Sequence, residues 1–172
     1  NIDGLGKKVI DQFWDLKIIR EPSDIFTINY DKIKNLEGWG KLSIDNLKKA
    51  IEKSKIIELD RFIFSIGIRH IGQENAKILA GFFQSIGKFT QLLKENDRKK
   101  ILSHLIDLDG IGKIQTDSID NFFSSSKNIK IIERLIDKLK INTFKTRNKK
   151  GKFSNKTIMF TGGFEKISRS EA

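Results

Sequence analysis

Residues 108–113 read Leu-Asp-Gly-Ile-Gly-Lys, and this short stretch decides the fold because the chain repeats it. The other copies are Ile2-Asp-Gly-Leu-Gly-Lys7, Leu36-Glu-Gly-Trp-Gly-Lys41 and Ile68-Arg-His-Ile-Gly-Gln73. Successive copies begin 34, 32 and 40 residues apart. Self-similarity at such a period indicates one supersecondary unit used several times.

Each copy runs into apolar residues at helical spacing. The fourth and seventh residues after the second glycine position are Ile10 and Phe13, Ile44 and Leu47, Ala76 and Leu79, and Thr116 and Ile119. Only Thr116 breaks this apolar stripe. The same period precedes the third and fourth copies, over 59–66 and 101–108, and returns over 132–139. The pattern predicts an all-α body of four tandem helix-hairpin-helix units, nearly all helix, in which short strands are hard to find before residue 156.

The two glycines of each copy predict a tight hairpin between packed helices. Such a hairpin needs a positive φ or a close backbone approach, which glycine allows without strain. The residue between the glycines should plug the helix pair; for Trp39, we weigh this against a surface that stacks on bases. The hairpin also leaves backbone N–H groups at the start of the second helix facing outward, which suits a phosphate oxygen.

Two other glycine-loop motifs are excluded. A dinucleotide-binding fingerprint needs a third glycine three residues after the second, where this chain has Val9, Ser43, Asn75 and Gln115. A nucleoside-triphosphate loop needs Ser or Thr directly after Gly-Lys. Gly6-Lys7, Gly40-Lys41, Gly87-Lys88 and Gly112-Lys113 are followed by Lys8, Leu42, Phe89 and Ile114.

Composition narrows the possible functions further. The 172 residues include 32% charged residues and no long apolar run, so we expect a soluble protein without a membrane span. The absence of cysteine excludes disulfides and thiolate zinc sites, and His70 and His104 are too few for a histidine metal cluster. The chain opens Asn1-Ile2-Asp3-Gly4, without a starting methionine or a signal peptide, so we expect a piece of a longer protein.

The net charge of +11 is unevenly distributed. Residues 1–137 carry 23 basic and 20 acidic side chains, whereas residues 138–164 carry eight basic ones and no acid. The stretch 142–155 has no apolar periodicity and is predicted to be a basic linker. Two interpretations stay open: a solvated tether, or a strap along nucleic-acid phosphates whose affinity depends on salt.

The copies, taken in order, resemble the helix-hairpin-helix domain of bacterial NAD-dependent DNA ligases. The resemblance rests on residues 1–6, 36–47, Ser65-Ile-Gly-Ile-Arg-His-Ile-Gly72, and 109–123 with its Phe122-Phe123 pair. After the linker, Lys156-Thr-Ile-Met-Phe-Thr-Gly162 resembles the first strand and turn of the BRCT domain that ends those enzymes. The implied organisation is a four-hairpin domain over 1–142, a linker over 143–155 and the start of a BRCT domain over 156–172.

The resemblance implies that the parent enzyme seals single-strand nicks in duplex DNA, in the bacterial cytoplasm at the nucleoid. It implies NAD, magnesium and zinc as cofactors of the parent and none in this part. The family's adenylated lysine stands in Lys-x-Asp-Gly, and the similar Asn1-Ile-Asp-Gly4 and Asp107-Leu-Asp-Gly110 lack that lysine. We therefore expect this chain alone to have no ligase activity and no catalytic residue.

The expected role is to grip nicked duplex DNA beside the rest of the ligase chain. The predicted DNA-binding residues are those of the hairpins: Gly4, Leu5, Gly6, Lys7, Gly38, Gly40, Lys41, Arg69, His70, Gly72, Gly110, Gly112 and Lys113. Arg69 replaces the acid of the other copies and is either a DNA contact or half of an ion pair. His70 replaces a glycine and is expected to fix its hairpin through its side chain. The basic run 98–100 is expected to be mainly a solvated helix face.

Two alternatives remain. One is a helix-hairpin-helix accessory domain of another DNA repair or recombination protein, which would share the hairpins but not the BRCT-like end. The other is a protein-interaction module, which would have no affinity for DNA at moderate salt.

Overall fold

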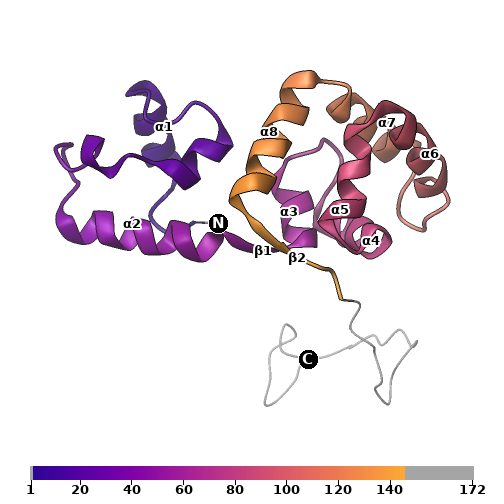
Figure 1. Cartoon of the computed structure of the whole chain (residues 1–172), viewed down its shortest axis with the longest axis horizontal. Helices are drawn as coiled ribbons and strands as arrows, with labels where there is room; N and C mark the ends of the chain where they lie inside the picture. The colour runs from indigo at the N-terminus through magenta and orange to yellow at the C-terminus, as the bar shows by residue number, and fades with distance from the viewer. Residues whose placement is uncertain (1, 146–172) are drawn as a thin grey trace, which may run out of the picture.

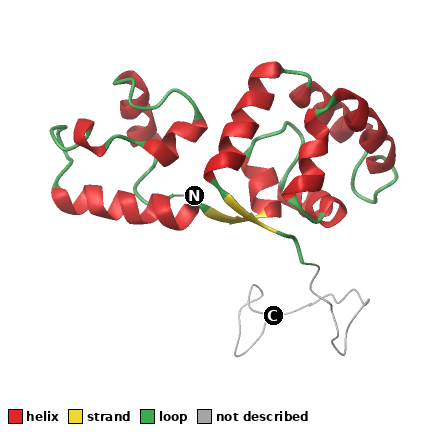
Figure 2. Cartoon of the chain, viewed as in Figure 1, coloured by secondary structure: helices red, strands yellow, loops and turns green. Residues whose placement is uncertain are grey.

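The computed structural model describes residues 2–145, and most of them are helical, as predicted (Figure 2). The α-helices are α1 (Lys7–Asp15), α2 (Lys41–Ser54), α3 (Leu59–Ser65), α4 (Gln73–Phe83), α5 (Ile86–Phe89), α6 (Glu95–Leu105), α7 (Lys113–Phe123) and α8 (Ser126–Lys138). Three 3-10 helices, η1 (Pro22–Thr27), η2 (Tyr30–Lys32) and η3 (Thr90–Leu93), and two strands, β1 (Ile56–Glu58) and β2 (Lys140–Asn142), complete this part.

The elements form two halves, each with its own core (Figure 1). The N-terminal half, from α1 to α2, buries Phe13, Ile19, Ile28, Ile33, Ile44, Leu47 and Ile51. The C-terminal half, from α3 to α8, buries a larger cluster that includes Phe62, Phe83, Phe89 and Phe123. The half-buried side chain of Phe26, in η1, packs against both clusters, so η1 and α8 form the junction between the halves.

The stripes predicted at helical spacing are the faces that the helices bury. Seven of the eight stripe residues have buried side chains, and Ile10 is half-buried. Thr116 is 6% exposed, and its hydroxyl donates to the carbonyl oxygens of Lys113 (3.0 Å) and Gly112 (3.3 Å). A buried hydroxyl that is hydrogen-bonded in this way fits an apolar stripe.

The helical domain is not all α, because two short strands lie before residue 156. β1 pairs in parallel with β2, with Ile57 opposite Ile141 (Figure 2). β1 links α2 to α3, while β2 follows α8, so this two-stranded sheet joins the middle of the chain to the end of the helical domain. Strands of three residues are too short to show the alternation of apolar and polar residues that indicates a strand.

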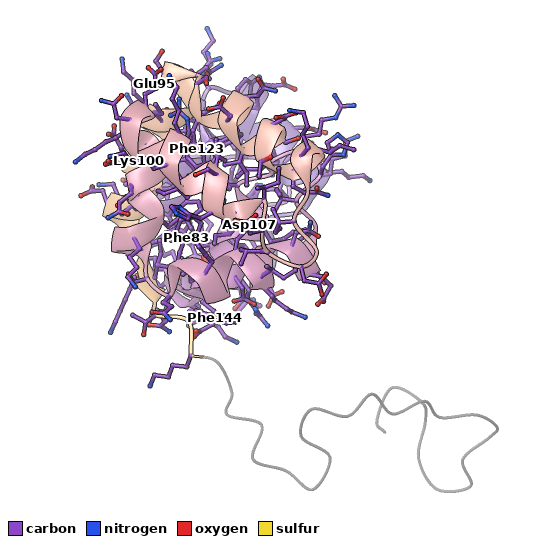
Figure 3. All side chains as sticks on the ribbon, turned by 90° about the vertical axis from the view of Figure 1, so that its right-hand side faces the viewer. Phe83, Glu95, Lys100, Asp107, Phe123 and Phe144 are labelled. Atoms are coloured by element: carbon purple, nitrogen blue, oxygen red, sulfur yellow. The ribbon has the colours of Figure 1, made fainter. Side chains whose placement is uncertain are left out.

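Residues just beyond β2 also belong to the fold. The backbone N–H of Phe144 donates to the carbonyl oxygen of Gln84 at 2.8 Å, and its half-buried ring packs on the C-terminal core beside Gly81. Figure 3 shows Phe144 at the edge of the domain and Phe83 and Phe123 inside it. The predicted linker was placed over 143–155, and its residues from 146 onward lie outside the described residues, as does the predicted BRCT start over 156–172.

The four sequence copies differ in what precedes them. α3 and α6 lead into the third and fourth copies, which are therefore complete helix-hairpin-helix units. The second copy follows only η2, and the described part of the first begins at Ile2. Within residues 2–145, no helix is both long enough and apolar enough to cross a bilayer.

Candidate nucleic-acid interface

The four copies form four turns with one hydrogen-bonding pattern. In each, the N–H of the residue between the glycine positions donates to the carbonyl oxygen three residues earlier, at 3.0–3.1 Å: Leu5 to Ile2, Trp39 to Leu36, Ile71 to Ile68 and Ile111 to Leu108. The third residue of each turn has a positive φ, of +78° at Gly4, +82° at Gly38, +62° at His70 and +86° at Gly110. A positive φ at this position is the mark of a type II turn. We number these turns one to four.

The second glycine of each copy is the N-cap of the following helix. Gly6, Gly40, Gly72 and Gly112 have extended backbones and precede α1, α2, α4 and α7. Lys7, Lys41 and Lys113 are the first helical residues in three copies, and all three side chains are exposed. Each turn thus presents the positive end of a helix dipole, with a lysine beside it in turns one, two and four.

The N-cap amides fall into two classes that the sequence analysis missed. The N–H of Gly40 donates to Ser43 Oγ at 2.9 Å, and the N–H of Gly112 donates to Gln115 Oε1 at 3.0 Å. Among the described residues, the N–H groups of Gly6 and Gly72 have no acceptor. The residue three positions after the N-cap decides the class, and Ser or Gln there is a recognisable capping signal.

Asn75, at that same position in the third copy, acts on a different turn. Its side-chain amide donates to the carbonyl oxygen of Gly110 at 3.2 Å. A Cβ added to Gly110 would lie 2.8 Å from Ile78 Cδ1. Turn four is therefore packed against α4, and these contacts bring the third and fourth copies together.

The first and second copies are brought together in a similar way. Trp39 Nε1 donates to Gln12 Oε1 at 3.2 Å, and the Trp39 ring lies 5.3 Å from the Phe13 ring between centroids. A hollow of about 340 Å³ lies between turn one and the start of α2, lined by Asp3, Gly4, Trp39, Ser43, Asn46 and Leu47. The contacts of Trp39 support its interpretation as a plug rather than a base-stacking surface.

Turn three departs from the other turns at two predicted site residues. Arg69 is exposed and forms no ion pair with any residue that the structure describes, so its charge is available to a ligand. His70 adopts the left-handed conformation that glycine has in the other turns, which histidine tolerates at a cost. Its side chain is exposed and makes no hydrogen bond within residues 2–145, so the expectation that it fixes the hairpin is wrong.

The basic run 98–100 is also only partly what the sequence predicted. Lys99 and Lys100 are exposed, and Figure 3 shows Lys100 on the outer side of α6. Arg98, however, is 5% exposed and ties α6 to neighbouring elements. It donates to Asp120 Oδ1 (2.8 Å) and to the carbonyl oxygens of Leu92 and Phe123 (both 3.1 Å). A buried, fully hydrogen-bonded guanidinium stabilises the C-terminal half and is not a DNA contact.

The described residues contain no group of three His, Cys, Asp or Glu side chains that would hold a metal ion. The site therefore consists of backbone amides, helix ends and exposed cations. Such an arrangement suits an anion that is bound by position and charge.

Comparison with known proteins agrees with this geometry. A family model described as a helix-hairpin-helix motif matches residues 61–132, which include turns three and four. The whole chain is 48% identical over 172 residues to a DNA ligase of Pelagibacter ubique (strain HTCC1062). It is 42% identical over 182 aligned positions to a DNA ligase of Rickettsia bellii (strain OSU 85-389).

The resemblance to DNA ligases is confirmed. The similarity covers 100% of this chain but 25% and 26% of the two DNA ligases, so the chain spans about a quarter of their length. Because the similarity reaches both ends of the chain, all four turns lie within the ligase-like sequence.

Proposed function

We propose that the chain is the DNA-binding part of a bacterial NAD-dependent DNA ligase that seals single-strand nicks during replication and repair. It would act in the cytoplasm, at the nucleoid, beside the rest of the ligase chain. The observation that carries the proposal is the repeated turn: four N-cap glycines at helix starts, each after a residue of positive φ, in a chain similar to DNA ligases throughout.

The turns would bind the phosphates of duplex DNA on the minor-groove side, near the nick. Backbone amides and helix N-termini hold phosphate oxygens and fix the position of a protein on DNA without reading the bases. The exposed lysines at the starts of α1, α2 and α7, and Arg69 in turn three, would add charge beside these phosphates. We therefore expect similar affinity for duplexes of unrelated sequence.

The four turns would not contribute equally. The amides of Gly6 and Gly72 are open to a phosphate oxygen, whereas those of Gly40 and Gly112 are occupied by Ser43 and Gln115. A phosphate at turn two or four must first displace one of these side chains, and this costs a hydrogen bond. Turns one and three should therefore bind phosphate more strongly.

The chemistry of ligation would come from elsewhere in the parent enzyme. The chain has no cysteine for a zinc module and no Lys-x-Asp-Gly for adenylation by NAD. Its described residues hold no cluster of carboxylates that suits magnesium. This chain would supply no catalytic step, and nick sealing by the chain with NAD and magnesium would overturn this part of the proposal.

The proposal is tested by titrating the chain against nicked and intact duplexes of one sequence, following fluorescence anisotropy over a salt series. A phosphate grip predicts that log K falls linearly with log salt concentration, with a slope of about −0.9 per phosphate contact. The double variant Lys7→Glu/Lys113→Glu should flatten the slope, because each lost contact removes roughly one unit. Lys99→Glu/Lys100→Glu makes the same charge change on exposed residues of α6, is the matched control, and should leave the slope unchanged.

Preference for the nicked duplex would tie the grip to ligation. No binding at low salt, or equal loss of binding in the control variant, would contradict the proposal.

A further inference from the structure

A groove of about 520 Å³ lies at the junction of the two halves, away from the turns. α1 and η1 form one wall and α8 forms the other, and Figure 1 shows α8 facing the N-terminal half. Its apolar lining includes Ile10, Trp14 and Ile131, and its basic rim includes Arg20, Lys127 and Lys130. No step of the proposed DNA grip uses these residues.

Trp14 gives the groove an unusual apolar wall. The side chain of Trp14 is 50% exposed, whereas Trp39 is held between its neighbours in the N-terminal half. The guanidinium carbon of Arg20 lies 6.0 Å from the centre of the Trp14 ring, which keeps the ring at the rim. A half-exposed tryptophan beside a hollow is the kind of side chain that dominates the binding energy of protein interfaces.

The rim carries uncompensated positive charge. Lys127, Lys130 and Arg134 follow one another at helical spacing on one face of α8, around Ile131. Arg134 is paired with Glu21 at 2.5 Å. Arg20, Lys127 and Lys130 pair with no carboxylate of residues 2–145, so a ligand in the groove would meet three free cations.

No residue of the four turns lines the groove, and on α1 turn one and Trp14 lie at opposite ends of the helix. Trp14 is seven residues after Lys7 on α1, which corresponds to about 10 Å along the helix axis. Lys127 follows the C-terminal end of α7, whose N-terminal end carries turn four. A ligand in the groove therefore leaves the turns accessible.

We propose that this groove docks an acidic segment of a separate protein, with a large apolar side chain of that segment against Trp14 and its carboxylates against Arg20, Lys127 and Lys130. The apolar lining favours a polypeptide over DNA, whose outer surface is charged and would leave the groove floor unpaired. Residues 146–172 match the basic rim poorly, because they carry seven basic and two acidic side chains. This inference does not depend on the proposed DNA grip.

The chain contains two tryptophans, and they report on the two surfaces separately. Trp14 lines the groove, and Trp39 lines the hollow at turns one and two. The indole N–H resonance of each tryptophan therefore reports on one surface. The probe is a short synthetic peptide with Leu and Phe on one helical face and Glu on both flanks, added to the ¹⁵N-labelled full chain. A matched peptide has Lys in place of every Glu.

The acidic peptide should shift the Trp14 indole resonance to saturation and leave that of Trp39 in place. In Lys127→Glu/Lys130→Glu, the affinity should fall at least about tenfold, because like charges then face the peptide. The control Lys49→Glu/Lys53→Glu, which makes the same charge change on exposed residues of α2, should bind as the wild type does. The Lys peptide should not bind.

Each other outcome overturns the docking proposal. A Trp14 resonance that does not move with the acidic peptide, or that responds equally to both peptides, contradicts the proposal. A Trp14 shift on addition of duplex DNA would make the groove a nucleic-acid surface, and a shift on concentrating the chain alone would make it a contact between copies. The results with the two peptides and with the chain alone leave the salt-dependent grip of the turns untested, so the docking proposal fails on them without the DNA proposal failing.

Discussion

In the C-terminal half, the plugs Ile71 and Ile111 are 5% and 3% exposed, whereas in the N-terminal half, Leu5 and Trp39 are only half-buried. The turns themselves share the same hydrogen bond and the same sign of φ. The turn is thus set by a few local residues, while the packing beneath it depends on the rest of the half.

The two cores explain the difference. In the C-terminal half, Phe89 stands edge-on to three other phenylalanines, with ring centroids 6.2 Å from Phe62, 5.3 Å from Phe83 and 5.8 Å from Phe123. The N-terminal half has a smaller cluster and one aromatic pair, Phe13 with Trp39. We therefore expect the C-terminal half to carry most of the stability and the N-terminal half to open first.

The largest expected effect is on the buried arginine of the C-terminal half. Arg98→Met leaves the carbonyl oxygens of Leu92 and Phe123 without their guanidinium donor and should cost about 4 kcal/mol, because each buried acceptor left unsatisfied costs roughly 1–3 kcal/mol. The contribution of Asp120 is small because its side chain is 46% exposed and screened by water. Urea denaturation measures the loss. The exposed neighbour Lys99→Met is the control, and an equal loss there would contradict a structural role for Arg98.

Truncating one plug residue in each half compares how tightly the two halves pack beneath their turns. Ile111→Ala removes a buried side chain and should cost about 3 kcal/mol, whereas Leu5→Ala, at a half-buried site, should cost roughly 1 kcal/mol. Both are read from the free energy of unfolding in urea. Equal costs would mean that the two halves support their turns equally.

Glycine substitutions separate the turn from its packing. Gly38→Ala places a Cβ in open space at φ +82°. It should lower the free energy of unfolding by about 1 kcal/mol, which is the cost of the left-handed conformation alone. Gly110→Ala has the same strain, and its Cβ also meets Ile78 Cδ1, for a total of about 2 kcal/mol. The extra cost is modest because the end of the Ile78 side chain is able to turn away. A larger loss of stability in Gly38→Ala than in Gly110→Ala would contradict this expectation.

Turn three has His70 where the other three turns have a glycine of positive φ. Because His70 has φ +62° and an exposed side chain without a partner in residues 2–145, His70→Gly should raise the free energy of unfolding by about 0.5–1 kcal/mol. The thermal midpoint measures the gain. Destabilisation would show that the imidazole supports the turn, as the sequence suggested.

The smallest effect concerns the ion pair that joins the halves. The hydrogen bonds from Arg134 and Ser23 lower the pKa of Glu21 below its ordinary value. A depressed folded-state pKa means that the pair stabilises above the unfolded pKa and that this stability is lost as pH falls through the folded one. The difference in Tm between the wild type and Glu21→Gln should be greatest at neutral pH, shrink as the pH falls below the ordinary pKa of a glutamate, and vanish only below the lowered pKa of Glu21 in the folded protein.

Glu95→Gln is the matched control for this pH series. Lys99 likewise lowers the pKa of Glu95, but both residues lie on exposed α6, within one half. Its effect on the junction should be nil at any pH. If Glu21→Gln and Glu95→Gln lower the Tm equally at neutral pH, the Glu21–Arg134 pair does not join the halves.

Much of the helical body could be predicted from sequence because a repeat with a 3.6-residue apolar period leaves few alternatives. Strands β1 and β2 could not, since three residues carry no period, and pairing between residues 56 and 140 is a long-range event. The burial of Arg98 could not be predicted because a basic run on a helix gives no sign of which side chain turns inward. The apolar plugs were predicted, but not how deeply each lies.

The turns of the candidate interface could be predicted from the sequence, but the differences between one turn and another could not. Gly, Lys and Arg positions follow directly from the repeat. That Ser43 and Gln115 cap two N-cap amides and Asn75 reaches the next copy depends on side-chain direction. The spacing of Ser43 and Gln115 from their glycines was a usable capping signal, whereas the contact of Asn75 had none.

The most direct test of phosphate binding by the turns follows the backbone amide resonances of Gly6, Gly40, Gly72 and Gly112 as nicked duplex DNA is added to the ¹⁵N-labelled chain. A phosphate grip predicts that all four respond over the same DNA concentrations, with the larger shifts at Gly6 and Gly72 because their amides are open. Four unmoved glycine resonances, with shifts gathered on exposed lysines elsewhere such as Lys99 and Lys100, would show that the turns do not hold the DNA.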